Sequence, residues 1–161
     1  MKIVTKFIFS LCLVAALGAT LTANAQIRSD ATIRANIPYS FVVNNTTLPA
    51  GKYLITVADP YGTDATVLEI RSANAKTAVL FETDFVAVPS LAPRTELVFD
   101  KIGDAYFLSK VFLQGDSGGN QLLKSKRQRR LEENGAIAEN HSIPASPTLA
   151  RFLKHVVRKT N

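Results

Sequence analysis

The chain has few of the residues that build covalent or metal-bound scaffolds: one cysteine, Cys12, and two histidines, His141 and His155. A single cysteine cannot form an intramolecular disulfide, and thiolate-bound metal sites need several cysteines. The two histidines lie fourteen residues apart, a spacing that is typical of no transition-metal site. We therefore expect no disulfide, no metal and no cofactor, and a fold that rests on an ordinary hydrophobic core.

The residue sets that catalysis needs are also missing. Gly115–Gly119 resembles the nucleophile segment of chymotrypsin-type serine proteases, whose serine needs a histidine as its base. That family places its histidine before the serine, whereas no histidine precedes Ser117 here. No glycine-rich loop leads into a helix that could bind phosphates. We predict that the protein is not an enzyme and that this segment is a polar loop between strands.

Residues 1–25 have the pattern of a cleaved export signal. Lys2 and Lys6 flank the charged start, Phe7–Leu21 is almost wholly apolar, and Ala23–Ala25 offers the small residues that a signal peptidase recognises. The apolar run is shorter than the roughly 20 residues that span a bilayer, which favours cleavage over a membrane anchor. We expect a periplasmic or extracellular protein.

Positive charge is concentrated at the C-terminal end. The whole chain has 19 Lys and Arg against 13 Asp and Glu, a net charge of +6. Residues 26–123 contain eight basic and ten acidic side chains, whereas residues 124–161 contain nine basic and three acidic ones. The body of the chain is therefore nearly neutral and its last quarter is basic.

Residues 26–135 alternate between apolar and polar side chains, as half-buried strands do. The first alternating run, Ile33–Val43, contains Pro38, which predicts an edge strand or a bend there. Leu48–Gly51 is a turn signal. No helical pattern separates the runs, so we predict an all-β domain, an antiparallel sandwich or small barrel of about six to eight strands. The other strands are expected at Lys52–Ala58, Thr66–Arg71, Thr77–Thr83, Glu96–Asp100 and Ala105–Leu113.

Four motifs occur in a fixed order: Ile37–Val43 (IPYSFVV), Leu48–Tyr53 (LPAGKY), Leu97–Leu108 (LVFDKIGDAYFL) and Leu122–Arg127 (LLKSKR). Together they resemble a family of small exported β-rich proteins of acidobacteria and related soil bacteria. The resemblance covers roughly residues 31–133. It implies a β fold and export, and it implies no activity or site.

A basic cluster follows the predicted strands. Five cations, Lys124, Lys126, Arg127, Arg129 and Arg130, lie within seven residues. We predict a thin amphipathic turn or an extended edge, and favour a solvated face over a binding patch. An anionic surface is the alternative partner. No aromatic residues interleave the cluster to stack on bases, so we expect no nucleic acid.

The C-terminal end reads as a linker over residues 136–146 and a basic amphipathic helix over residues 147–161. Ser146 and Pro147 form a good helix start. The helix would present one apolar face, which either packs on the β body or contacts a membrane surface or a partner. The apolar positions are Leu149, Phe152, Leu153, Val156 and Val157.

These features favour an exported, non-enzymatic protein that binds a partner or builds the cell envelope; its partner would be an envelope protein or an anionic surface. One alternative is a peripheral membrane or partner-docking protein that acts through the C-terminal helix. Another is a small barrel that carries an apolar ligand, although aromatic side chains more often fill such a barrel. The aromatic residues concerned are Phe41, Tyr53, Phe81, Phe99, Tyr106 and Phe112.

Overall fold

The computed structural model describes residues 31–58 and 66–149. These residues form ten strands and one short helix, which confirms the all-β prediction. The elements are β1 (Ala31–Ile37), β2 (Phe41–Val43), β3 (Thr46–Leu48), β4 (Gly51–Val57), β5 (Thr66–Ser72), β6 (Ala78–Ala87), β7 (Glu96–Ile102), β8 (Ala105–Phe112), β9 (Gly118–Leu122), α2 (Lys126–Glu133) and β10 (Glu139–Leu149).

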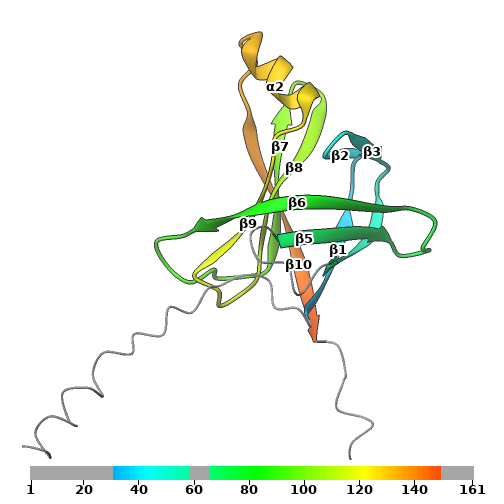
Figure 1. Ribbon diagram of the computed structural model, residues 1–161, viewed down its shortest axis with the longest axis vertical. Helices are drawn as coiled ribbons and strands as arrows, with labels where there is room; N and C mark the ends of the chain where they lie inside the picture. The colour runs from blue at the N-terminus through cyan, green and yellow to red at the C-terminus, as the bar shows by residue number, and fades with distance from the viewer. Residues whose placement is uncertain (1–30, 59–65, 150–161) are drawn as a thin grey trace, which may run out of the picture.

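Eight of these strands close into an antiparallel barrel (Figure 1). Their order around the wall is β8-β7-β10-β1-β4-β5-β6-β9, and β9 pairs again with β8. The hairpin of β2 and β3 lies outside this ring, because β2 pairs in parallel with β8. The sequence pattern was compatible with a sandwich or a barrel, and the structure is a barrel.

The predicted bend at Pro38 is present. β1 ends at Ile37, and the chain resumes as β2 at Phe41 after three residues outside the ladder. Proline has no N–H to donate, so the strand breaks where the ladder would need one. The bend lets β1 pair with β4 in the barrel wall while Phe41 pairs with Tyr106 of β8.

Part of the segment Gly115–Gly119, which resembles a protease loop, belongs to a strand. Gly118–Leu122 forms β9, which pairs with β6 on one side and β8 on the other. A Cβ on Gly119 would lie 2.5 Å from Cδ1 of Phe112 and 2.6 Å from the carbonyl oxygen of Val111. A Cβ on Gly118 would likewise overlap the ring of Phe85. The glycines therefore allow β9 to fit between its two neighbours, which closes the barrel.

The linker predicted over residues 136–146 is wrong, because most of it belongs to β10. The first half of β10 pairs with β7, and Ala145–Leu149 pairs with β1. Each half therefore has a ladder partner along one edge only, a setting that tolerates Pro144 and Pro147. The predicted helix does not begin at Pro147, since the strand continues to Leu149. The rest of that prediction lies outside the described residues.

Side chains fill the interior of the barrel. Two of the predicted aromatic residues, Phe41 and Phe99, lie against each other edge to face with ring centroids 5.5 Å apart. Tyr53 and Phe81 are also buried, and Tyr106 packs against this cluster from its edge. The interior is thus a packed core, as expected for a barrel of eight strands. Side chains at most 1% exposed in it include Ile33, Phe41, Ile55, Leu68, Ile70, Leu97, Phe99 and Val111.

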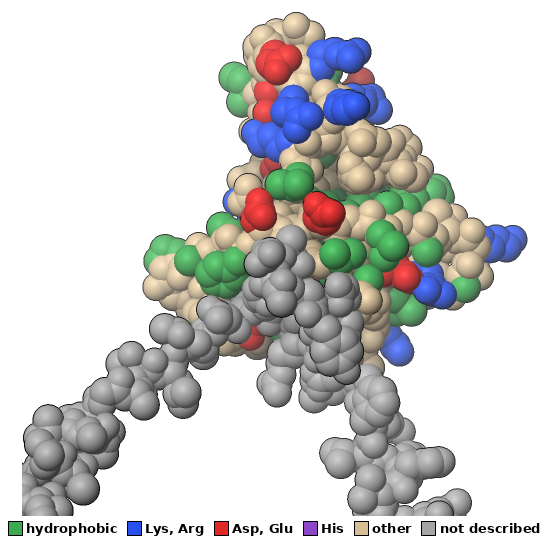
Figure 2. Space-filling model, in the orientation of Figure 1, with side chains coloured by type: hydrophobic (Ala, Val, Ile, Leu, Met, Phe, Trp, Pro, Cys, Tyr) green, Lys and Arg blue, Asp and Glu red, His purple; other side chains and the backbone are tan. Residues whose placement is uncertain are grey.

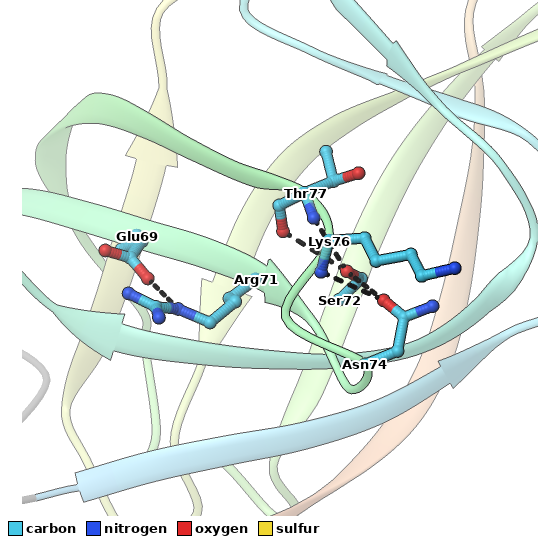
Figure 3. Close-up of polar contacts among 6 residues, drawn as sticks. All are labelled: Glu69, Arg71, Ser72, Asn74, Lys76 and Thr77. Atoms are coloured by element: carbon cyan, nitrogen blue, oxygen red, sulfur yellow. Dashed lines mark hydrogen bonds and ion pairs between the residues drawn. The ribbon is translucent and has the colours of Figure 1, made fainter.

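The β5–β6 hairpin has a turn held by its own side chains (Figure 3). The Asn74 carboxamide oxygen accepts hydrogen bonds from the Lys76 backbone N–H at 3.1 Å and from the Ser72 hydroxyl at 2.8 Å. Thr77 N–H donates in turn to the Ser72 hydroxyl oxygen at 3.1 Å. These bonds fix the register of β5 on β6, which places Glu69 opposite Leu80.

We predict that Gly119→Ala destabilises the barrel by about 1–3 kcal/mol, because the added methyl overlaps a backbone oxygen that cannot move freely. Gly51→Ala is the matched control, since its Cβ would meet only Tyr53 at 3.7 Å. The free energies of unfolding are measured in urea. Equal losses in the two variants would contradict the proposed role of Gly119 in closure.

Candidate functional site

Helix α2 begins and ends on clear local signals. The Ser125 side chain caps the N-terminus by accepting a hydrogen bond from the Gln128 N–H at 3.1 Å. Gly135 follows the helix with φ +87°, a conformation that glycine adopts without strain. Its N–H donates to the Glu132 carbonyl at 2.9 Å, and the Ala136 N–H donates to the Leu131 carbonyl at 3.1 Å. The sequence 125–136 thus encodes a short, well-bounded helix.

One face of this segment lies against the barrel. Every third residue, Leu122, Ser125 and Gln128, is buried, and Leu131 is partly buried. Leu131 packs on a small apolar cluster of Val42, Ile102 and Phe107. That cluster lies on the β2 hairpin and on the β7–β8 hairpin, so α2 covers the end of the barrel where these meet (Figure 1).

A buried polar contact fixes the helix to the barrel wall. Gln128 Nε2 donates to Asp100 Oδ2 at 2.8 Å, and the two side chains come from α2 and β7. Gln128 is 3% exposed and Asp100 is 9% exposed, so little water competes for this bond. A buried hydrogen bond to a carboxylate is directional, and leaving the carboxylate unpaired would be costly. The contact therefore sets the orientation of α2.

The opposite face of this segment carries the five predicted cations, and we call their side chains the basic cap: Lys124, Lys126, Arg127, Arg129 and Arg130. All five are exposed. Figure 2 shows Lys and Arg side chains gathered at the end of the molecule that carries α2.

Few interactions neutralise the basic cap. Lys124 Nζ lies 2.7 Å from Glu132 Oε2, and this is its one ion pair among the described residues. Arg129 Nη1 donates to the Lys124 carbonyl at 3.0 Å, and Arg127 lies 5.9 Å from the centroid of the Phe107 ring. Four of the five charges thus have no acidic partner within 4 Å in the described part of the chain. The cap is a positively charged surface on a fixed support.

The structure separates the two groups of residues predicted as contact sites. The basic cap precedes the first residue of β10, whereas Leu149 is its last residue, at the far end of the barrel (Figure 1). The remaining predicted contacts, Phe152, Leu153, Val156 and Val157, lie outside the described residues.

The cluster is a helix and not the turn or extended edge that its weak apolar periodicity suggested. The expectation failed because two of the buried positions, Ser125 and Gln128, are polar, so the helix face shows little hydrophobicity. The capping serine and the three-residue spacing of Leu122, Ser125, Gln128 and Leu131 were the available signals. The partner Asp100 was not detectable, because it is 28 residues away in the chain.

A second group of polar side chains lies where β8, β7 and β10 adjoin. The ring of Tyr39 stacks on Tyr106 with centroids 3.7 Å apart, and Tyr106 meets His141 edge to face at 5.5 Å. The Tyr39 hydroxyl is buried without a hydrogen-bond partner among the described residues. Burial, and then the neighbouring Tyr106, raise the pKa of Tyr39 to about 12. Tyr39 therefore stays neutral at physiological pH and packs as an aromatic side chain.

Three further observations limit the chemistry of the described residues. Ser117 is exposed, and its carbonyl accepts a hydrogen bond from the Val88 N–H at 3.1 Å. No group of three or more His, Cys, Asp or Glu side chains within 31–58 and 66–149 is arranged to hold a metal ion. In the same residues, no helix is long and apolar enough to cross a membrane.

Fold and surface together define a small antiparallel β-barrel with a basic helical cap. Comparisons with protein-family models, with curated proteins and with solved structures find no match for the chain.

We predict that Gln128→Glu destabilises the protein by about 2–3 kcal/mol at neutral pH, because it places a second carboxylate against Asp100. The loss should shrink as the pH is lowered, because a proton shared by the two carboxyl groups removes their repulsion. The rate of hydrogen exchange of the α2 amides should rise in Gln128→Glu as its stability falls. Gln114→Glu, at an exposed position, is the control; a loss of equal size there would contradict the anchoring role of Gln128.

We predict that Tyr39→Phe leaves stability at pH 7 unchanged or slightly higher, because it removes an unpartnered buried hydroxyl. The folded-state pKa of Tyr39, about 12, lies above the ordinary value of 10.0. The free energy of unfolding of the wild type should therefore fall as the pH rises from about 10 to about 12, because Tyr39 ionises in the unfolded chain before it ionises in the folded one. Urea midpoints across this range should fall less steeply for Tyr39→Phe. Parallel curves would contradict the assignment.

Proposed function

We propose that this protein is an exported, non-enzymatic binding protein of the cell envelope whose contact surface is the basic cap. Its ligand would be a polyanion with phosphate, sulfate or carboxylate groups. The observation that carries the proposal is the exposure of five cations, four on one face of α2 and Lys124 just before it, of which only Lys124 is ion-paired in the described residues.

The support beneath the cap favours binding over simple solvation. Association costs less when the binding groups are already ordered, and α2 is held by Gln128, Ser125 and Leu131. Three of the five cations are arginines, and an arginine side chain can donate two parallel hydrogen bonds to a phosphate or carboxylate. Each cation near an anionic surface contributes about 1 kcal/mol. Several of them acting together give useful affinity without a cavity.

The other parts of the proposal come from the sequence. Residues 1–25 have the pattern of a signal peptide, and their removal would leave a chain without cysteine. A polyanion outside the cytoplasm is a polymer of the envelope or an anionic lipid headgroup. The packed core speaks against a carrier of apolar ligands, since Phe41 and Phe99 fill the space that such a ligand would need.

We predict that replacing Lys126, Arg127, Arg129 and Arg130 by glutamine lowers affinity for polyanions by about tenfold or more at low salt. Two probes separate the sources of negative charge: a heparin column, and phosphatidylcholine vesicles with or without phosphatidylglycerol. Wild-type binding should weaken as salt is added, because the contact is electrostatic.

Two matched variants control this experiment. Replacing Arg34, Lys52, Lys76 and Lys110 by glutamine removes the same charge from the barrel and should leave most of the affinity. Replacing Arg151, Lys154, Arg158 and Lys159 tests the C-terminal segment. If the C-terminal variant lost binding and the basic-cap variant kept it, the contact would lie at residues 150–161 and the basic cap would be excluded.

A further inference from the structure

The outer wall of β4, β5 and β6 carries apolar side chains that are exposed or half-buried in the described structure. Leu54, Val67 and Leu80 point outward from the three strands, and we call them the outer apolar face. Leu80 is 58% exposed. A hollow of about 590 Å³ is lined by Leu54 and Leu80. A second, of about 480 Å³, is lined by Val67 and Leu80 and continues past the edge of β6 to Leu122 and Leu123. Adjoining hollows around an exposed leucine are typical of a docking surface.

The charges around this face are mainly negative. Glu69, Glu82 and Asp84 point outward from β5 and β6, and acidic side chains lie beside apolar ones over β6 (Figure 2). Glu69 is paired with Arg71 at 2.5 Å (Figure 3). Glu82 and Asp84 are exposed and have no ion-pair partner among the described residues. The face therefore suits an occupant that is both apolar and basic.

The C-terminal residues 150–161 have this composition. Four of them are Lys or Arg and none is Asp or Glu, and the apolar positions recur with the spacing of one helix face. The four cations are Arg151, Lys154, Arg158 and Lys159, and the apolar positions are Phe152, Leu153, Val156 and Val157.

The register of the sheet brings the end of β10 level with Leu80. Four strand spacings separate the two, about 19 Å along the wall. Twelve residues cover ~18 Å as a helix, slightly less than this distance, and about 40 Å when extended. Residues 150–161 are therefore long enough to reach Leu80 when part of the segment is extended. The row of paired residues that connects them is Thr148, Thr32, Thr56, Glu69 and Leu80.

We propose that residues 150–161 dock across the outer apolar face of their own barrel. Their apolar side chains cover Leu54 and Leu80, and their cations lie beside Glu82 and Asp84. This contact is independent of the basic cap, which lies at the other end of β10. It leaves the cap as the free cationic surface of the molecule.

Cysteine cross-linking tests this contact in the whole chain. In a Cys12→Ser background, Leu80→Cys with Val156→Cys should form an intramolecular disulfide about tenfold faster than Ile137→Cys with Val156→Cys. Ile137 is 85% exposed and lies between α2 and β10, so it is the matched position away from the face. Equal rates would overturn the proposal. Disulfides found only in dimers would also overturn it and assign the face to a second copy.

A second readout needs no engineered thiol. Trypsin cleavage at Arg151, Lys154, Arg158 and Lys159 should be several-fold faster in Leu80→Gln than in the wild type. Leu91→Gln is the control, because Leu91 is as exposed as Leu80 but lies in the loop between β6 and β7. Cleavage of the wild type as fast as of a free peptide of the same sequence would overturn the proposal.

Discussion

Closure of the barrel by β9 is the constraint on which the other features depend. One edge of β8 pairs first with β2 and then with β9, so β9 is the strand that joins the two ends of the wall. Gly118 and Gly119 make this possible, because any side chain there would meet its neighbours. Without closure, the side chains of the core would face water along an open edge. The core and the wall are therefore one cooperative unit.

Closure also decides where the basic cap lies. β9 leaves the wall at Leu122, and α2 begins at Lys126 after three intervening residues. The contact of Gln128 with Asp100 then fixes the helix over the β7–β8 hairpin. A helix of eight residues is marginal when isolated, so its order comes from this packing and from its caps. The cationic surface is thus a consequence of how the barrel ends.

Opposite charges lie on separate surfaces of the folded protein. The basic cap gathers five cations at one end, whereas Glu82 and Asp84 lie on the wall of β6 beside an exposed leucine. Two surfaces of opposite character can serve two different contacts without competing. In the proposals made above, the cap contacts a polyanion and the wall holds the C-terminal segment.

Sequence alone determined the all-β class, most of the strands and the bend at Pro38, because alternating side chains and a missing N–H are local properties. It also located the five cations. It misassigned β9 and β10, whose glycines and prolines are local signals for loops. Tertiary structure decided that Gly119 fits between two strands, that each half of β10 pairs with a different strand, and that Gln128 meets Asp100. Those outcomes depend on partners far away in the chain, and the register that joins them is set only when the barrel closes.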